Sequence, residues 1–183
     1  MSDDLETRLS RIRLLVLDVD GTLTNGGIYF GGNGEELKRF HTQDGLGMVL
    51  ARGVGLQTAW VTGRESSIVW RRSQELATPR NLVLQGVKDK IKAVNFLAKE
   101  MEITLSEMAF MGDDLNDLAA MSEVGVALCP ADAASHIQGA ADWVATRRGG
   151  EGAVREAIEL ILTARGDYEK AVALYLDKLT PGQ

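Results

Sequence analysis

The sequence predicts an α/β protein built on a doubly wound parallel sheet, because short apolar segments alternate with stretches of helical periodicity. One helical stretch covers residues 88–101, where Ile91, Val94 and Leu97 recur at intervals of three residues. The strand-like segments lie at residues 14–18, 56–62, 81–85, 108–113, 124–128 and 142–145. This alternation implies right-handed βαβ units, and such sheets bind ligands at the carboxyl ends of their strands.

Chain length and composition favour a single domain over residues 1–183. The formal net charge is −6, whereas a protein that binds nucleic acid gathers Lys and Arg on its surface. No apolar run approaches the ~20 residues of a membrane span, and the start of the chain lacks the apolar stretch of a signal peptide. Cys129 is the only cysteine, which excludes an internal disulfide. We therefore expect a cytoplasmic protein with no nucleic-acid or membrane partner.

Polar residues follow the predicted strands at the edge where a ligand would bind. Asp18 and Asp20 follow the first strand, and Thr62 follows the second. Those that follow the later strands are Lys90, Asp113, Asp114 and Asp117. Like charges this close repel one another, so carboxylates gather in this way around a hard cation. The cluster predicts a Mg²⁺ site beside a phosphate whose remaining oxygens are held by Lys90 and the Thr62 hydroxyl.

Each of these motifs has a simpler interpretation by itself. A DxD pair at a strand end is often only a turn or a metal feature, and the sequence TGR is typical of any turn. GDDLND, at residues 112–117, matches a helix N-terminus, where Asp and Asn cap unpaired amides. A lysine at a helix start usually faces solvent. Together, in this order and each at a strand end, the motifs favour a catalytic site over a set of helix caps.

The order of the motifs resembles the haloacid dehalogenase superfamily of phosphotransferases, whose core is a Rossmann-like sheet. The resemblance implies that Asp18 is a nucleophile that forms an aspartyl-phosphate and that Asp20 is the general acid and base. It assigns catalysis to Asp18, Asp20, Thr62 and Lys90, and Mg²⁺ binding to Asp18, Asp20 and Asp113. Asp114 and Asp117 would then orient the waters of the metal or hold Lys90.

The intervals between the motifs leave no room for a cap domain, either between Thr22 and Thr62 or between Lys90 and Asp113. Instead, strand-like runs flank the glycine-rich sequence GGNG, which predicts a β-hairpin over about residues 26–41. This pattern resembles the capless subgroup of the superfamily, which implies a homotetramer whose hairpins form a central barrel. A lone hairpin is marginally stable and exposes its edges, which favours such assembly, although a surface flap on a monomer is the simpler alternative.

Other motifs resemble a sugar-acid phosphatase branch of this subgroup, over about residues 12–162. They are FHTQDGLG at 40–47, QGVKDK at 85–90, GDDLND at 112–117 and RRGGEGAVRE at 147–156. The resemblance implies hydrolysis of 3-deoxy-D-manno-octulosonate 8-phosphate for lipopolysaccharide synthesis. The glycines of the last motif would let its backbone approach a ligand or a neighbouring subunit. A further helix, predicted over about residues 167–179, lies beyond the matching part.

A sugar-acid substrate requires a group that binds its carboxylate. Arg64 is the best candidate, because a guanidinium binds a carboxylate bidentately, although a surface arginine near a helix start is the simpler interpretation. Related nonulosonate 9-phosphate phosphatases tend to carry Glu at this position, and a phosphatase for such a sugar is the main alternative. The other residues predicted to contact the substrate are Thr42, Gly63 and Asn116.

Two alternatives come from other functional classes. A phospho-receiver switch carries its phosphorylated Asp at the end of the third strand, where the segment NLVLQG has no acid. A regulatory phosphatase-like domain would lack part of the catalytic set, yet Asp18, Asp20, Lys90 and Asp113 are all present. The sequence therefore favours an active phosphoric monoester hydrolase.

Overall fold

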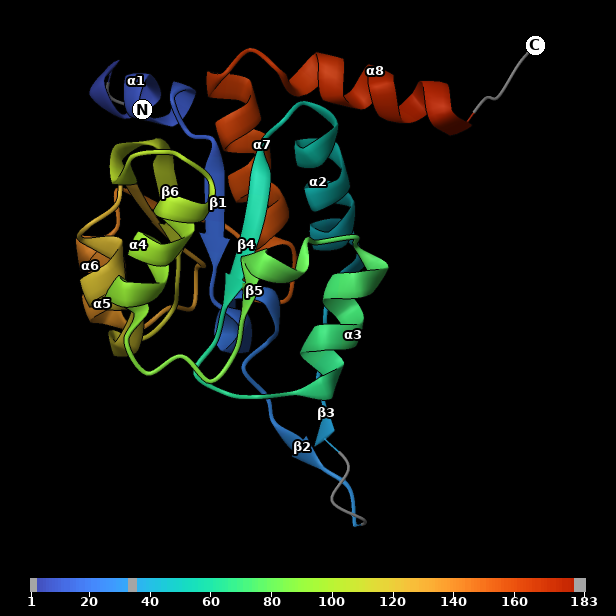
Figure 1. The fold of residues 1–183 in the computed structure, drawn as a ribbon, viewed down its shortest axis with the longest axis vertical. Helices are drawn as coiled ribbons and strands as arrows, with labels where there is room; N and C mark the ends of the chain where they lie inside the picture. The colour runs from blue at the N-terminus through green and yellow to red at the C-terminus, as the bar shows by residue number, and fades with distance from the viewer. Residues whose placement is uncertain (1–2, 33–35, 180–183) are drawn as a thin grey trace.

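The computed structural model describes residues 3–32 and 36–179 and confirms the predicted parallel α/β sheet (Figure 1). Within these residues the central sheet has six strands in the order β5-β4-β1-β6-β7-β8, and each neighbouring pair is parallel. The strands are β1 (Leu14–Leu17), β4 (Gln57–Val61), β5 (Val83–Leu84), β6 (Met108–Met111), β7 (Val126–Cys129) and β8 (Trp143–Val144). The edge strands β5 and β8 are shorter than predicted, because each pairs along two residues with a single neighbour.

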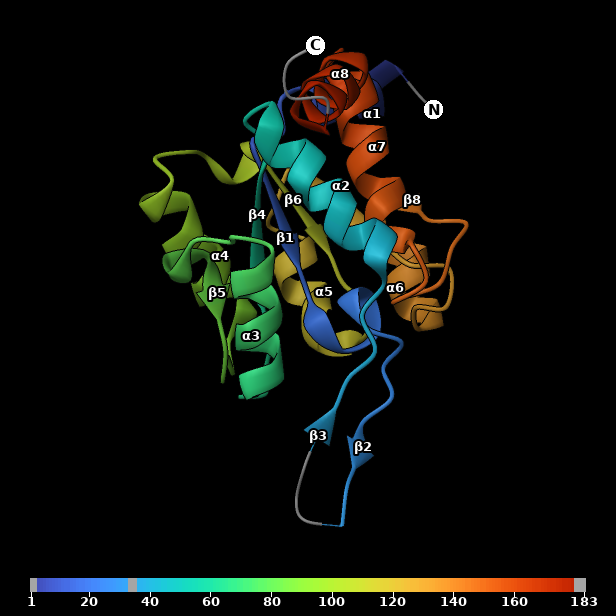
Figure 2. The same ribbon diagram turned by 90° about the vertical axis from the view of Figure 1, so that its right-hand side faces the viewer.

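Helices cover both faces of the sheet, as a doubly wound fold requires (Figure 1, Figure 2). One face carries α1 (Asp3–Ser10), α2 (Thr42–Gly53), α3 (Ser67–Glu75), α7 (Ala153–Ala164) and α8 (Tyr168–Leu179). The other carries α4 (Lys90–Glu100), α5 (Leu115–Met121) and α6 (Ser135–Ala140). Leu15 and Leu17 of β1 pack into the first apolar core, and Leu14 and Val16 pack into the second. Burial on both faces explains the unbroken apolar run that precedes Asp18.

β2 (Tyr29–Phe30) and β3 (Glu36–Leu37) form the predicted antiparallel hairpin. The hairpin projects beyond the carboxyl ends of the sheet strands (Figure 1, Figure 2). Residues 33–35, which include part of the predicted GGNG turn, lie outside the described residues. The exposed apolar side chains of this segment are Ile28, Tyr29, Phe30 and Leu37. The hairpin therefore presents an apolar surface on the same side of the molecule as the predicted site.

The C-terminal helix α8 lies at the opposite end of the sheet from the hairpin (Figure 1). It packs against α2 and α7, where Ala171 is buried and Tyr168 and Tyr175 contact the core. This placement keeps α8 away from the carboxyl edge of the sheet, and residues 180–183 lie outside the described part of the chain. Across the described ranges, no helix combines the length and the apolar content needed to cross a membrane.

Candidate active site

The first strand ends in a turn that requires glycine. Asp18 follows β1 and is buried, and its amide donates to the Met111 carbonyl of β6 at 3.0 Å. The chain then turns through η1 (Val19–Leu23), where Gly21 has a φ of +107°. A Cβ atom on Gly21 would lie 2.0 Å from a carboxylate oxygen of Asp113, so no side chain fits there. The DxDG sequence therefore allows Asp113 to pack directly against the turn that carries Asp18.

Lys90 is buried between two carboxylates. It is the first residue of α4, a helix capped by the Asp89 side chain, which accepts a hydrogen bond from the Lys92 amide at 3.1 Å. The Lys90 ammonium donates to Asp18 at 2.5 Å and also to Asp117. Burial lowers the pKa of Lys90, but the two carboxylates outweigh this effect and the net shift is upward. Lys90 therefore stays charged and holds the Asp18 carboxylate in place.

The three aspartates of GDDLND have different partners. Asp117 is fully buried in the first turn of α5 and binds Lys90 through one oxygen. Its other oxygen accepts hydrogen bonds from the Asp113 and Asp114 amides at 3.0 and 3.3 Å. The exposed Asp114 side chain caps α5 by accepting from the next amide at 2.8 Å. Asp113 accepts from the Thr22 hydroxyl at 3.3 Å and so faces the turn after β1.

Asp18, Asp113 and Asp117 each offer a carboxylate oxygen within 4.8 Å of the others. Burial, and then the charge of Asp117, raises the pKa of Asp18 to about 6. Burial, and then the charges of Asp18 and Asp117, raises the pKa of Asp113 to about 8. A bridging cation stabilises the ionised form of carboxylates that repel one another. Because Lys90 and backbone amides already bind both oxygens of Asp117, the pair that fits a divalent metal is Asp18 and Asp113.

Among the described carboxylates, Asp20 is not part of this three-aspartate group, although the sequence predicts it as a metal ligand. The Asp20 carboxylate instead binds the Lys38 ammonium of the hairpin, and its role as a metal ligand stays a prediction. Its second oxygen lies 3.5 Å from the hydroxyl of Thr62, which is buried directly after β4. The Thr62 hydroxyl accepts from the Arg64 amide at 3.2 Å. The Asp20 side chain therefore faces the hairpin side of the site.

The residues predicted to contact a substrate are exposed in the structure. Arg64 has a side chain that is 45% exposed, and its guanidinium lies 3.4 Å from the Glu36 carboxylate of the hairpin. The other predicted contacts are exposed residues that follow β4 or lie in the first turn of a helix: Thr42, Gly63 and Asn116. The structure brings Arg64 to the same side as Asp20, whereas the roles of the other three residues stay predictions.

The glycine-rich segment before α7 packs against the turn of its own chain that follows β1. A Cβ atom on Gly149 would lie 1.7 Å from the Gly21 carbonyl oxygen, and the Gly150 amide donates to the Thr22 carbonyl at 3.0 Å. Gly149 and Gly150 thus allow a contact between two backbones within the chain, and their predicted approach to a ligand or a neighbouring subunit stays a prediction. This contact supports the turn that holds Asp18.

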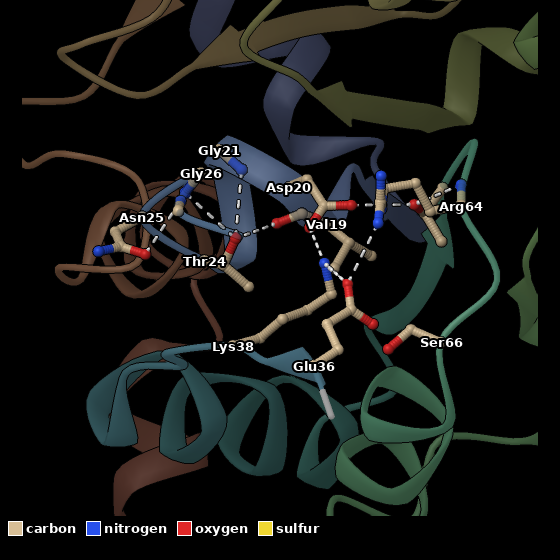
Figure 3. Close-up of polar contacts among 12 residues, drawn as sticks. Val19, Asp20, Gly21, Thr24, Asn25, Gly26, Glu36, Lys38, Arg64 and Ser66 are labelled. Carbon is tan, nitrogen blue, oxygen red and sulfur yellow. Dashed lines mark hydrogen bonds and ion pairs between the residues drawn. The ribbon is translucent and has the colours of Figure 1, made fainter. Parts of the chain in front are cut away.

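Two charged hairpin residues, Glu36 and Lys38, reach the site from outside the four sequence motifs (Figure 3). They are two positions apart in ELKRF, and residues at this spacing share one face of a strand. Leu37 between them is exposed, whereas the Lys38 side chain is 0% exposed. This alternation was the available sequence signal, but it does not show which part of the molecule the shared face contacts.

The edge of the sheet thus combines a buried carboxylate beside a lysine, a carboxylate pair suited to a metal, and a threonine hydroxyl. This combination defines a metal-dependent phosphotransfer site on a parallel α/β fold. A family model for haloacid dehalogenase-like hydrolases matches residues 69–158.

Three relatives make the comparison more specific. The 3-deoxy-D-manno-octulosonate 8-phosphate phosphatase of Escherichia coli is 39% identical over 171 residues, which cover 93% of this chain and 90% of the relative. The enzyme of the same name from Moraxella catarrhalis, in complex with magnesium, phosphate and KDO, has a TM-score of 0.91 at 36% identity and 96% and 99% coverage. The cobalt-bound phosphatase from Haemophilus influenzae has a TM-score of 0.87 at 35% identity and 92% and 99% coverage.

The chain therefore belongs to the haloacid dehalogenase-like hydrolases, in the family of the 3-deoxy-D-manno-octulosonate 8-phosphate phosphatases. This membership confirms the resemblance predicted from the motifs.

Proposed function

We propose that the protein is a Mg²⁺-dependent phosphatase that hydrolyses 3-deoxy-D-manno-octulosonate 8-phosphate to the free sugar acid and phosphate, for lipopolysaccharide synthesis. The observation that carries this proposal is the Lys90 ammonium, which binds Asp18 beside Asp113. The chain is also 36% identical to a relative whose structure contains magnesium, phosphate and the sugar acid. A cytoplasmic location stays a prediction.

In the proposed mechanism, residues of this site carry out both halves of the reaction. Asp18 attacks phosphorus, and the bond from phosphorus to the sugar oxygen breaks as the aspartyl-phosphate forms. Asp20 donates a proton to the departing oxygen and later accepts one from the water that hydrolyses the aspartyl-phosphate. Lys90 and the Thr62 hydroxyl bind the phosphate oxygens. Mg²⁺, held by Asp18 and Asp113, would offset the charge of the two anions that must meet.

Arg64 is the proposed contact for the carboxylate of the substrate. Its guanidinium is partly exposed, lies on the Asp20 side of the site and already binds a carboxylate, that of Glu36. A charged sugar acid would compete for the same guanidinium with bidentate geometry. Thr42, Gly63 and Asn116 are proposed to contact the remainder of the sugar phosphate.

A panel of phosphate esters assayed with Mg²⁺ tests the proposed substrate. We expect the highest kcat/KM for 3-deoxy-D-manno-octulosonate 8-phosphate, a lower value for a nonulosonate 9-phosphate, and no turnover in excess chelator. Matched sugar phosphates without a carboxylate serve as controls. A preference for the nonulosonate, or equal rates with and without a carboxylate, would contradict the proposal.

We also infer a homotetramer that assembles through the hairpin. Phe30 and Leu37 are 71% and 62% exposed, and a two-stranded unit cannot bury such side chains by itself. Packing hairpins around a shared axis would cover them and remove the open strand edges.

Light scattering tests this assembly, and we expect a mass about four times the 19.8 kDa of one chain. Phe30→Asp is expected to dissociate the tetramer and lower sugar-acid turnover. Leu176→Asp is the control, because Leu176 is 54% exposed on α8 at the other end of the sheet. A fully active monomer would contradict this inference.

A further inference from the structure

Lys38 has an unusual environment for a residue on a projecting hairpin. It directly follows β3, yet its side chain is 0% exposed, while the adjacent Leu37 is 62% exposed. Its ammonium contacts the carboxylates of Asp20 and Glu36, the latter at 3.2 Å (Figure 3). Removing an ammonium from water costs several kcal/mol unless carboxylates compensate, so a lysine on a surface hairpin would otherwise extend into solvent. The buried orientation of Lys38 therefore depends on its two partners.

The contacts of Lys38 form a chain of alternating charges that leads away from Asp20. Lys38 and Arg64 bind the same carboxylate oxygen of Glu36, at 3.2 and 3.4 Å (Figure 3). At the other end, one oxygen of Asp20 binds Lys38 and the second lies 3.5 Å from the Thr62 hydroxyl. Both oxygens of Asp20 thus have a neighbour that limits rotation of the carboxylate, and one of those neighbours belongs to the hairpin.

We propose that Lys38 is a positioning residue that fixes the Asp20 carboxylate for proton transfer, so that the hairpin completes the acid–base side of the site within its own chain. This inference rests on the proposed role of Asp20. It gives the hairpin a task separate from subunit assembly, because the contact from Lys38 to Asp20 lies within one chain. Glu36 supports the arrangement by binding the other side of the Lys38 ammonium.

Positioning of a general acid has a kinetic consequence that a merely structural role lacks. A sugar or alkyl alkoxide is a poor leaving group and needs a proton as its bond to phosphorus breaks, whereas p-nitrophenolate leaves without one. The ratio kcat/KM reports the steps through formation of the aspartyl-phosphate, in which Asp20 donates its proton. A displaced Asp20 should therefore slow esters according to the basicity of their leaving group.

The test measures kcat/KM of the full-length, Mg²⁺-loaded protein for a series of esters from p-nitrophenyl phosphate to simple alkyl phosphates. Lys38→Met keeps the apolar stem but removes the charge. General acid catalysis contributes ~10²–10⁴-fold, so we expect a loss of about 10- to 100-fold for alkyl phosphates and less than about threefold for p-nitrophenyl phosphate. Lys38→Arg, which retains the cation, should recover part of the alkyl activity.

Arg39→Met is the matched control, because Arg39 is the next residue, is 56% exposed and contacts Glu151 at 3.5 Å. Its leaving-group dependence should equal that of the unchanged protein. An equal loss for all esters in Lys38→Met, or no loss, would overturn the inference. If Lys38→Met does not fold, the Glu36→Gln variant serves as the test. We expect it to lose less kcat/KM, by an amount that again grows with the basicity of the leaving group.

The proposed substrate and the proposed role of Lys38 can be contradicted by different results. If the sugar-acid panel shows no preference but the leaving-group effect appears, the proposed substrate is wrong and the role of Lys38 stands. If the panel succeeds but the loss in Lys38→Met does not depend on the leaving group, the role of Lys38 is wrong and the substrate stands.

Discussion

Two lysines of this protein make the same kind of contact in different surroundings, because each ammonium binds two carboxylates. We call these sets the core triad and the hairpin triad. They are Asp18, Lys90 and Asp117 in the core, and Asp20, Lys38 and Glu36 at the hairpin. Side chains of the core triad are 0–6% exposed. In the hairpin triad Lys38 is 0% exposed, but its carboxylates are 19% and 18% exposed.

The supporting structure explains what each triad can do. The core triad joins a residue that follows β1 to residues in the first turns of α4 and α5, and its side chains are 0–6% exposed, so its groups have little access to water if one partner is lost. The hairpin triad depends on a strand of two residues that projects from the domain (Figure 2). The same ion-pair chemistry should therefore control stability and reaction in the core, but only the orientation of reacting groups at the hairpin. Four predictions test this difference, beginning with the largest expected effect on activity.

The largest effect is expected from Asp18→Asn in the core triad. Loss of the nucleophile should lower kcat by about 10⁴-fold or more, because the aspartyl-phosphate cannot form. The thermal midpoint should fall less than in a variant that lacks Lys90, because Asp117 still binds the Lys90 ammonium when Asp18 is replaced. Steady-state assays and calorimetry measure the two quantities. Substantial activity in this variant would contradict the proposed mechanism.

The difference in stability between the two triads should be clearest when Lys90→Met is compared with Lys38→Met. Removing one partner of a buried ion pair costs about 3–5 kcal/mol, so we expect a loss of this size in the free energy of unfolding. Lys38→Met should cost less than about 2 kcal/mol, because water can reach the exposed part of its carboxylates.

Urea unfolding of both variants, compared at pH 7 in excess chelator, measures this difference. Equal losses would mean that the hairpin holds its charges as rigidly as the core does.

Arg64→Ala should weaken the preference for a sugar-acid substrate rather than slow the transfer of phosphate. A hydrogen bond to a charged group contributes about 1.5–3 kcal/mol, so KM for the sugar acid should rise about 10- to 100-fold. A phosphate ester without a carboxylate should be almost unaffected.

Arg13→Ala is the control, because Arg13 is similarly exposed and contacts Glu107 at 3.3 Å at the amino end of the sheet. Equal losses on both kinds of substrate would assign Arg64 to the phosphate or to the fold.

The last of the four predictions concerns pH and the metal, and its readout is stability rather than activity. The folded-state pKa values of Asp18 and Asp113 are raised to about 6 and about 8, from an ordinary value of 3.8. Between pH 4 and 8 the folded chain therefore holds protons that the unfolded chain has lost. The free energy of unfolding contributed by these groups falls as pH rises through this window.

Thermal midpoints measured in excess chelator should follow this trend, and Asp113→Asn should reduce the slope. Excess Mg²⁺ should also reduce it, because metal binding favours the ionised carboxylates. A slope that Asp113→Asn and Mg²⁺ leave unchanged would contradict the assignment of the titrating group.

The sequence by itself determined the sheet and the contents of its carboxyl edge. The apolar run of β1 shows burial on both faces, and the alternation with helices makes the strands parallel. Parallel strands end at a common edge, so Asp18, Thr62 and Asp113 had to lie near one another once the strands were identified. Lys90 could be added because it opens a helix that starts from that same edge. These inferences need only the local pattern and the direction of each strand.

The tertiary structure alone decided which charges pair across elements. Alternation places Glu36 and Lys38 on one face, but the path of the chain through the turn after β1 determines that this face contacts Asp20 and Arg64. The contact of Gly149 with Gly21 likewise depends on how the segment before α7 crosses the sheet edge. Periodicity fixes the orientation of a side chain within its own element, whereas a contact between elements also depends on their relative positions, which packing of the whole core determines.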